Sequence, residues 1–467
     1  MGNLALSVGS NALTFQISLP TLAEVTAASL TSDEDSLHSI RLSGVSTDTR
    51  SIKKNDVFLA LKGDRFDGHR FVQQAIDLGA AGVIVQEPVN AVPQLLVQDT
   101  LVAYHAIAQW WRQQLNTPIV AITGSVGKTT TKELVAAALS TQGGAVLKTQ
   151  ANYNNEVGVP KTLLALDASH HYGVIEMGMR GPGQIALLTQ TTRPNVAVIT
   201  NVGTAHIELL GSEQAIADAK CELFQGLDAN GIAVLNHNDQ RLMKTAARVW
   251  TGEQITFGLE AGDVAGRLID RDWLEVEGVK LPLPLPGKHN ATNLLAAIAV
   301  MKAFGLDWKT LQSGLTVDLP GGRSTRVTLP NDLVFLDETY NAGVESMTAA
   351  LALLKETPGC RHIAVLGTMK ELGEHSVRLH RQVGQVVKDL SLDALFTLAE
   401  PSAAAALATG AGPIPTESFN DPHTLQERLK ELLQPGDCVL FKASRAISLD
   451  QVVNHLKAHF AGPSAQD

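Results

Sequence analysis

The sequence predicts an α/β protein built from three domains, and two observations support this prediction. Short apolar runs that are typical of strands alternate with helical patterns along most of the 467 residues, which favours parallel sheets flanked by helices. The chain is also too long for one hydrophobic core, because cores stop growing at roughly 250–300 residues. We expect the domains at residues 1–115, 116–318 and 319–467.

The composition argues against several classes of protein. A formal net charge of −10 does not suit a nonspecific nucleic-acid binder, although local lysines can still bind an anion. No apolar run approaches the roughly 18–20 residues of a membrane span, and we expect no signal peptide. The three cysteines are far apart and have no metal-binding spacing, which is typical of a protein from a reducing cytoplasm.

The first block predicts a small α/β unit. Its apolar runs indicate strands at 57–61, 82–85 and 95–97, and its helical patterns lie at 71–78 and 101–115. Asn116-Thr117-Pro118 then has the composition of a hinge.

The middle block predicts a parallel sheet with helices between most of its strands. The strands are expected at 119–123, 145–149, 172–176, 196–201 and 231–235. Residues 281–286 carry proline at alternate positions, which suits an edge strand or an extended segment. A helix is expected at 290–304.

The last block predicts a second sheet of the same kind. Strands are expected at 334–337, 363–367, 394–398 and 439–442, and helices at 347–355, 424–433 and 449–460. The block has no G-x-G-x-x-G motif, so we do not expect a dinucleotide cofactor.

The segment Thr123-Gly124-Ser125-Val126-Gly127-Lys128-Thr129-Thr130 indicates a phosphate-binding loop. It follows a predicted strand and precedes a helical pattern at 132–140, so backbone N–H groups and a helix N-terminus can face an anion. Lys128 would reach the outer phosphates, and the Thr129 hydroxyl would hold Mg²⁺. Ile122 stands where the general motif has its first glycine, so an ordinary turn is the alternative.

Three further residues, Glu176, His206 and Lys220, lie in the middle block at or after the ends of predicted strands. Ligands of parallel sheets bind outside these strand ends. Read singly, each residue is more often an ordinary surface group. Read together, Thr129, Glu176 and His206 offer the oxygen and nitrogen ligands that Mg²⁺ accepts, with Mn²⁺ as an alternative, and could position two ions near an ATP.

Two asparagine-rich segments are candidates for binding. Asn152, Asn154 and Asn155 follow a predicted strand and suit a substrate that carries carboxylate or phosphate, although a polar turn explains them equally well. In His289-Asn290-x-x-Asn293, Asn290 can be a simple helix cap. Capping leaves His289 and Asn293 unexplained.

In this order the residues resemble the Mur ligases, ATP-dependent enzymes that form amide bonds in cell-wall precursor synthesis. The match to T-G-[ST]-x-G-K-[ST] accounts for the missing glycine. Within the family the similarity is greatest to the members that join D-Ala-D-Ala to UDP-N-acetylmuramoyl-tripeptide, because the segments at 48–50, 57–63, 67–71, 366–373 and 442–445 resemble theirs and the Asp-Asn-Pro-Arg signature of a sister enzyme is absent. The segment at 337–344 and Ala443 depart from the pattern.

The resemblance implies a small uridine-nucleotide domain, a central P-loop ATPase-like domain and a C-terminal Rossmann-like domain. It implies an acyl phosphate made with ATP, two small-molecule substrates, no nucleic-acid partner, and a monomer in the bacterial cytoplasm. It further implies that Lys220 is carbamylated by CO₂, since an ammonium cannot ligate a metal.

Roles for single residues also follow from the resemblance. Lys128, His206 and Lys220 would be catalytic, with Thr129, Glu176, His206 and the Lys220 carbamate on the metal ions. The ATP site would comprise Gly124, Ser125, Val126, Gly127, Lys128, Thr129 and Thr130, with His289, Asn290 and Asn293 on the adenine side, Arg323 on phosphate, Asp337 on the ribose, and Tyr340. The substrates would meet Asp48, Arg50, His69, Asn152, Asn154, Asn155, Lys442, Ser444 and Arg445.

Three alternatives stay open from the sequence. Another amino-acid-adding Mur ligase and folylpolyglutamate synthase share the central domain. The uridine-type block before the phosphate loop argues against the synthase. A nucleotide-driven conformational switch would use ATP without forming an amide, but such a switch needs no extra α/β domain for an amine substrate.

Overall fold

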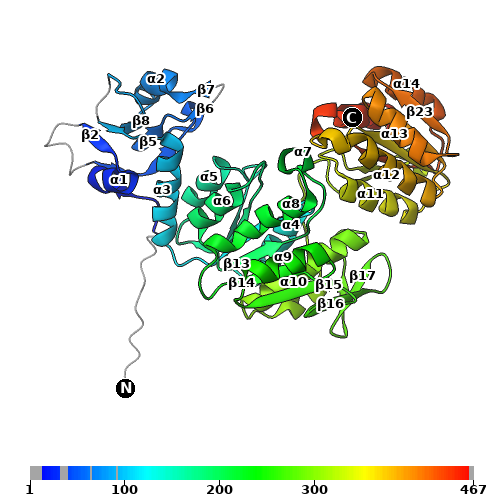
Figure 1. The fold of residues 1–467 in the computed structure, drawn as a ribbon, viewed down its shortest axis with the longest axis horizontal. Coiled ribbons are helices and arrows are strands. Elements are labelled where there is room, and N and C mark those ends of the chain that lie inside the picture. The colour runs from blue at the N-terminus through cyan, green and yellow to red at the C-terminus, as the bar shows by residue number, and fades with distance from the viewer. Residues whose placement is uncertain (1–12, 32–39, 64–65, 91–92, 462–467) are drawn as a thin grey trace, which may run out of the picture.

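The computed structural model describes residues 13–31, 40–63, 66–90 and 93–461. Three α/β units follow one another along the chain, and Figure 1 shows them side by side in chain order, with the middle unit between the other two. The predicted fold class of three α/β domains is confirmed. None of the helices in the described part of the chain is long and apolar enough to cross a membrane.

The N-terminal unit is built on a five-stranded sheet. In spatial order its strands are β2 (Ser29–Thr31), β9 (Gln94–Leu96), β8 (Gly82–Val85), β5 (Asp56–Leu59) and β4 (Gly44–Ser46). Two helices, α1 (Leu19–Thr26) and α2 (Val72–Asp77), and two short pairs complete it: β1 (Ile17–Ser18) with β3 (Arg41–Leu42), and β6 (Lys62–Gly63) with β7 (Phe66–Asp67). The three predicted strands are present. The remaining short strands, β1 to β4, β6 and β7, were missed because segments of two or three residues carry no readable alternation.

Helix α3 (Thr100–Gln113) ties the first unit to the second. Trp111 Nε1 donates to Leu166 O at 2.8 Å, and Arg112 Nε donates to Thr192 O at 3.0 Å, so the helix is fixed on the middle unit. The Phe15 ring packs edge-on against Trp111 from the first unit. The expected hinge at 116–118 is not free either, because buried Thr117 donates to His170 O at 3.2 Å.

The middle unit has a nine-stranded sheet. In spatial order it runs β11 (Ala145–Lys148), β12 (His170–Glu176), β10 (Ile119–Thr123), β13 (Val196–Ile199), β14 (Ile232–Asn236), β15 (Gln254–Leu259), β16 (Val264–Leu268), β17 (Trp273–Val276) and β18 (Val279–Pro282). The strands from β11 to β16 pair in parallel, as predicted, and β17 and β18 add an antiparallel edge. Proline-bearing β18 lies at that edge, where a missing N–H costs no ladder bond.

Helices cover both faces of this sheet. Val120 and Ile122 of β10 face one core with α4 (Lys128–Ser140) and α10 (Lys288–Ala303). Ile119 and Ala121 face the other core, which holds the remaining helices: α5 (Gly158–Leu164), α6 (Gln184–Thr192), α8 (Glu213–Cys221) and α9 (Gln240–Val249). Because both faces are buried, the strand is an uninterrupted apolar run, the pattern that predicted it.

The C-terminal unit has a six-stranded sheet flanked by five helices. The strands in spatial order are β19 (Thr325–Thr328), β20 (Val334–Asp337), β24 (Cys438–Lys442), β21 (His362–Gly367), β22 (Ala394–Leu398) and β23 (Thr416–Phe419). The helices are α11 (Val344–Glu356), α12 (Ser376–Asp389), α13 (Pro401–Ala411), α14 (Pro422–Leu432) and α15 (Leu449–Ala461). All pairs are parallel except β19 with β20, so the carboxyl ends of β20, β21 and β24 share one edge.

Candidate active site

The phosphate loop connects β10 to α4 and is built on two glycines. Gly127 has a φ of +82° and directly precedes α4, so the first N–H groups of the helix point into the loop. Gly124 has a φ of +155°, and a Cβ there would lie 1.9 Å from Thr200 Oγ1. Both positions therefore require glycine, as the motif predicts.

The end of β13 fixes the shape of this loop. Asn201 Oδ1 accepts from Val126 N and Asn201 Nδ2 donates to Val126 O, both at 3.0 Å, while Thr200 Oγ1 donates to the same carbonyl at 2.6 Å. Ser125 Oγ accepts from Gly203 N at 2.8 Å. These contacts hold the loop in one conformation through side chains, so it does not have to be ordered by a ligand.

Two lysines, one in the loop and one on α8, influence each other at this site. Lys128 Nζ donates to Gly124 O at 2.7 Å, and desolvation lowers its pKa, with Glu176 opposing that shift and Arg323 adding to it. Lys220 is buried, and its pKa lies well below the usual value, chiefly because of burial and secondly because of Lys128. A lysine ammonium in a desolvated region favours the binding of an anion, and a lysine with a strongly lowered pKa gives up its proton more readily.

Glu176 at the end of β12 carries a carboxylate oxygen that suits a metal ion. The residue is 2% exposed, and Asn154 Nδ2 donates to its Oε1 at 2.8 Å. Its Oε2 is buried and has no hydrogen-bond partner among the described residues. A buried carboxylate oxygen without a partner is costly unless a cation or donor meets it. With Thr129 buried in the first turn of α4, the residues fit a hard divalent cation.

His206 lies away from this pair, at the boundary with the C-terminal unit. It has a φ of +67°, and its Nδ1 is paired with the Glu371 carboxylate. That pairing holds the pKa of Glu371 below its usual value. The structure therefore brings His206 to Glu371 and shows no contact between it and Glu176, so its metal role stays a prediction.

The start of α10 meets the phosphate loop from the other side. Asn293 Oδ1 accepts from Thr131 Oγ1 at 3.2 Å and lies 2.9 Å from the Cβ position at Gly127. Asn290 Nδ2 donates back to Pro286 O at 2.8 Å, which orders the turn before the helix. His289 lies beside them, and burial lowers its pKa. Their predicted adenine contacts stay predictions.

Residues of the C-terminal unit face the same region. The Arg323 guanidinium carbon lies 3.6 Å from the centre of the Tyr340 ring, and its buried Nε has no partner among the described residues. Asp337 at the end of β20 accepts from Thr339 Oγ1 at 2.7 Å and from Lys457 Nζ at 3.2 Å. Arg323 thus has a free donor for an anion, whereas both oxygens of Asp337 already have partners.

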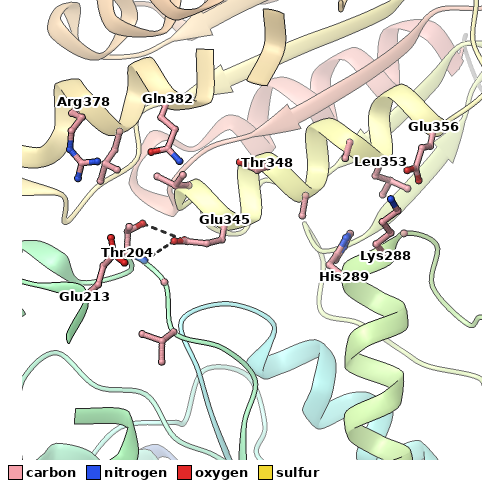
Figure 2. A pocket seen from close by; sticks show the side chains of 17 residues that line it. Thr204, Glu213, Lys288, His289, Glu345, Thr348, Leu353, Glu356, Arg378 and Gln382 are labelled. Atoms are coloured by element: carbon pink, nitrogen blue, oxygen red, sulfur yellow. Dashed lines mark hydrogen bonds between the residues drawn. The ribbon is translucent and has the colours of Figure 1, made fainter. Parts of the chain in front are cut away.

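A cavity of about 650 Å³ lies between the middle and C-terminal units (Figure 2). Lys288 and His289 of α10 line it on one side, and α11, along its whole length, lines it on the other together with the first turns of α12. The Glu345 carboxylate crosses the boundary and accepts from Thr204 N at 2.7 Å and from Thr204 Oγ1 at 3.3 Å. The two units therefore meet around the loop that follows β13.

Three family models match the chain in succession. They are the Mur ligase family catalytic domain at residues 41–121, the Mur ligase middle domain at 122–301 and the Mur ligase glutamate ligase domain at 322–445. This chain belongs to the Mur ligase family. Its phosphate loop lies where the middle-domain match begins, and Arg323 and Lys442 lie within the last match.

Relatives that match this Mur ligase over nearly their whole length show which members of the family it is similar to. UDP-N-acetylmuramoyl-tripeptide–D-alanyl-D-alanine ligase from Synechocystis is 55% identical over 90% of this chain and 93% of its own, and the Escherichia coli enzyme of that name is 39% identical over 90% and 94%. A crystal structure of MurF from Acinetobacter baumannii has a TM-score of 0.87 at 31% identity, covering 95% of this chain and 99% of its own. MurF from Thermotoga maritima in complex with ADP has a TM-score of 0.78 at 30% identity, covering 89% and 97%.

The residues expected to receive the dipeptide lie at the end of β24. Lys442 is buried, its Nζ donates to Asn341 O at 3.0 Å, and burial lowers its pKa. Ser444 Oγ accepts from Lys370 N at 2.9 Å, which fixes the loop after β21. Arg445 points to the surface, where its Nη1 lies 3.3 Å from Asp450 Oδ2. Only Lys442 is both buried and close to Arg323.

The residues expected at the uridine side of this Mur ligase are mostly engaged with one another. Arg50 binds Asp48 through Nε at 2.9 Å and Nη2 at 2.6 Å, which lowers the pKa of Asp48 to about 2. His69 Nε2 accepts from Gln86 N at 2.9 Å, so Nδ1 carries the proton and donates to Asp67 at 2.8 Å. Both ring nitrogens of His69 therefore support the loop.

The asparagine segment of this ligase divides into three roles. Asn154 holds Glu176, Asn155 Oδ1 accepts from Gly158 N at 2.9 Å and so caps α5, and Asn152 is exposed. None of the three asparagines has the left-handed backbone of the polar-turn alternative, and binding of a substrate by this segment stays a prediction. Asn152 keeps its predicted role at the substrate.

Several residues of the site were not foreseen from the sequence. Thr200 and Asn201 support the phosphate loop, and Glu345 and Glu371 join the units. The sequence did contain a sign of the role of Asn201. Asn201 is a polar residue that follows a buried strand, and that strand lies beside β10, which leads into the phosphate loop, so both strand ends lie at the same sheet edge. Glu371 lies in the segment 366–373 that carries the resemblance, but no local pattern links Glu371 to His206 or Glu345 to Thr204, because these pairs join two different units.

Proposed function

We propose that this Mur ligase joins D-Ala-D-Ala to UDP-N-acetylmuramoyl-tripeptide at the expense of ATP in peptidoglycan precursor synthesis. The observation that carries the assignment is the match to relatives of that activity over about nine-tenths of the chain, phosphate loop and last unit included. A ligase that adds a different amino acid would be expected to show lower identity to these relatives. The chain resembles one such enzyme, a diaminopimelate ligase, at only 16% identity.

The reaction proceeds in two displacements. A carboxylate oxygen of the tripeptide attacks the γ-phosphorus of ATP, the bond to the bridging oxygen breaks, and ADP leaves an acyl phosphate behind. The amine of D-Ala-D-Ala then attacks the acyl carbon, phosphate leaves with the carboxyl oxygen, and the nitrogen loses a proton. Positioning accounts for much of the rate, on the order of 7–11 kcal/mol.

The chain's own groups support the first displacement. The preformed loop offers backbone N–H groups to the phosphates, and Lys128 and Arg323 offset the repulsion between carboxylate and triphosphate. Both side chains meet at one site only because the middle and C-terminal units face each other there, which makes closure of these units a natural step.

The metal ions and the carbamate are the finer part of the proposal. Thr129 and a carbamylated Lys220 would hold one Mg²⁺, and Glu176 and His206 would hold the second; bound Mg²⁺ neutralises charge on the transferring phosphoryl group. Lys220 is buried on α8 with no hydrogen bond from its Nζ among the described residues, a position that suits an anion-forming amine better than a free ammonium. Labelling with ¹³CO₂ and a carbamate signal lost in Lys220→Ala is the check.

The remaining expectations are kept as part of this proposal. The uridine end of the substrate lies against the first unit near Asp48, Arg50 and His69, and Asn152 of the middle unit faces the sugar-peptide or phosphate part. The boundaries at 115/116 and 318/319 separate the domains. The enzyme works as a monomer in the bacterial cytoplasm, where ATP and the nucleotide-linked peptide are available. Folylpolyglutamate synthase shares the fold at 16% identity, and nothing in the N-terminal unit favours a folate substrate.

Phosphate release with each substrate omitted in turn tests the proposal. We expect release from ATP only when UDP-N-acetylmuramoyl-tripeptide and D-Ala-D-Ala are both present, with a new amide in equal amount. Release without the amine, or with a folate and glutamate instead, contradicts it. Release that needs neither acid nor amine would indicate a nucleotide-driven switch.

A further inference from the structure

Four charged side chains of alternating sign run from the reaction centre toward the surface of the middle domain. In order they are Glu176, Lys132, Glu133 and Lys148. The first three are 2%, 1% and 5% exposed, and the Lys148 side chain is 34% exposed. Buried charges in such a row persist only where each one has a partner.

Lys132 divides its contacts unequally between its two carboxylate neighbours. Its Nζ lies 2.9 Å from Glu133 Oε1 and donates to Thr149 O at 2.7 Å. It lies 4.0 Å from Glu176 Oε2, beyond hydrogen-bond distance. Glu133 Oε2 in turn pairs with Lys148, which lines a second cavity of about 430 Å³ together with Glu133.

The backbone keeps this arrangement close to the phosphate loop. Lys132 lies on α4 three residues after Thr129, so one helix carries the loop and the ammonium that faces Glu176. Thr149 Oγ1 accepts from Glu176 N at 2.9 Å, and Asn154 holds Glu176 Oε1. Glu176 is therefore fixed through its backbone and one oxygen, while its second oxygen stays unpaired.

The charge on Glu133 explains why Glu176 Oε2 has no hydrogen-bond partner among the described residues. A lysine without Glu133 would turn to Glu176, the nearest remaining carboxylate, and the ion pair would occupy Oε2. With Glu133 in place, the Lys132 ammonium contacts Glu133 and donates to Thr149 O. It stays 4.0 Å from Glu176 Oε2 and forms no hydrogen bond with it. Partners behind a metal ligand commonly set affinity in this way.

We propose that Glu133 is a positioning residue: it holds the Lys132 ammonium and so keeps Glu176 Oε2 available to the divalent cation. This inference rests on the proposed metal site at Glu176. Lys148 forms an ion pair with Glu133 Oε2, and no contact between Lys148 and Glu176 is present in the described part of the chain.

The test compares Glu133→Gln, which keeps the shape and removes the charge, with Lys148→Met. Mn²⁺ is titrated into the full-length protein without nucleotide, and free Mn²⁺ is followed by electron paramagnetic resonance. For Glu133→Gln we expect the Kd for Mn²⁺ to rise about tenfold. We also expect the KM for Mg²⁺ to rise while kcat recovers at high Mg²⁺. Lys148→Met should stay within about twofold of the unmodified protein, because the contact between Lys132 and Glu133 persists.

Each outcome bears on one claim. If the unmodified protein binds no Mn²⁺, the proposed metal site fails. If it binds Mn²⁺ and Glu133→Gln binds equally well, the positioning role is overturned while the metal site stands. Glu133→Asp, which keeps the charge, should bind nearer to the unmodified protein than Glu133→Gln does, and equal losses in both would indicate packing instead. If Glu133→Gln does not fold, Lys132→Met is titrated instead. It removes the ammonium that would turn to Glu176, so its Kd for Mn²⁺ should not exceed that of the unmodified protein, and a rise in Kd would overturn the positioning role.

Discussion

At the scale of single residues, the reaction centre of this Mur ligase holds basic side chains whose hydrogen-bond donors are only partly used. Lys128 donates only to loop carbonyls, Arg323 has a buried Nε without a partner in the described structure, and Lys220 has a strongly lowered pKa. Such groups are costly in the unliganded protein and become favourable when a triphosphate and a carboxylate arrive.

Lys128→Met removes a charge that the phosphates need and little else. We expect kcat/KM for ATP to fall at least about 100-fold, since positioned donors of this kind are worth that much. Thermal unfolding should be nearly unchanged, because Lys128 makes hydrogen bonds only within the loop. Steady-state phosphate release measures the effect, with the exposed Lys309→Met as control. Activity within threefold of the unmodified enzyme would remove Lys128 from the mechanism.

Asp48 gives a pH-dependent prediction. Its pKa falls from 3.8 to about 2, chiefly through the hydrogen bond from the Arg50 side chain. A lowered carboxyl pKa stabilises the fold above pH 3.8, and this contribution is lost as the pH falls toward 2. Because both side chains are largely solvated, Asp48→Asn should lower the free energy of unfolding by less than about 1 kcal/mol at pH 7.

The measurement is urea unfolding of both proteins at several pH values. The difference between them should be constant from pH 5 to pH 7 and should shrink below about pH 4. A difference that grows on acidification would show that the assigned ion pair does not stabilise the fold.

At the scale of elements, the buried strands were predictable and the sheet edges were not. Residues 119–123 and 394–398 match β10 and β22 at both ends, because both faces of each strand are covered and the run is apolar throughout. The strands at 254–276 alternate with polar residues and turns, and they were missed, whereas the edge segment expected at 281–286 overlaps β18 at 281–282. Helix α4 begins four residues earlier than expected, since its first turn belongs to the phosphate motif.

The site was predictable only where its residues lie close together in the sequence and form a motif. The phosphate loop is one such segment, and Glu176 is a carboxylate that ends a buried strand. The pairing of His206 with Glu371 spans 165 residues, and that of Glu345 with Thr204 spans 141. Contacts between units depend on how the domains meet, and no local pattern records that arrangement.

Gly124→Ala tests the geometry of the phosphate loop as an element. A Cβ at this position would lie 1.9 Å from Thr200 Oγ1, at a φ of +155°. We expect a loss of about 1–3 kcal/mol in the free energy of unfolding and a large rise in the KM for ATP. Gly181→Ala, where the added methyl group has open space around it, is the matched control. Equal stability of the two variants would contradict the loop as described.

At the scale of the whole molecule, the middle and C-terminal domains meet through few polar contacts. Glu345 on Thr204 and Glu371 on His206 both hold the loop that follows β13 and carries the predicted metal ligand. Charge-assisted bonds of this kind are strong singly but few in number here. Closure for catalysis can therefore exchange them for contacts with substrate.

Removing Glu345 should loosen this arrangement. In Glu345→Ala the hydrogen bonds to Thr204 are lost, so the distance distribution between dyes on the two domains should broaden in single-molecule fluorescence transfer. Glu427→Ala, on the exposed face of α14 where it pairs with Lys430 of the same helix, should leave the distribution unchanged. Identical distributions for both variants would mean that other contacts set the domain arrangement.

The central claim, that a tripeptide carboxylate is activated by the γ-phosphate of ATP, is tested most directly with oxygen isotopes. The terminal carboxylate of the nucleotide tripeptide is labelled with ¹⁸O at both oxygens, and the released phosphate is examined by mass spectrometry. The account predicts one ¹⁸O atom in each phosphate and one retained in the new amide. Phosphate without label would show that water, not the carboxylate, had attacked ATP, and would contradict the acyl phosphate.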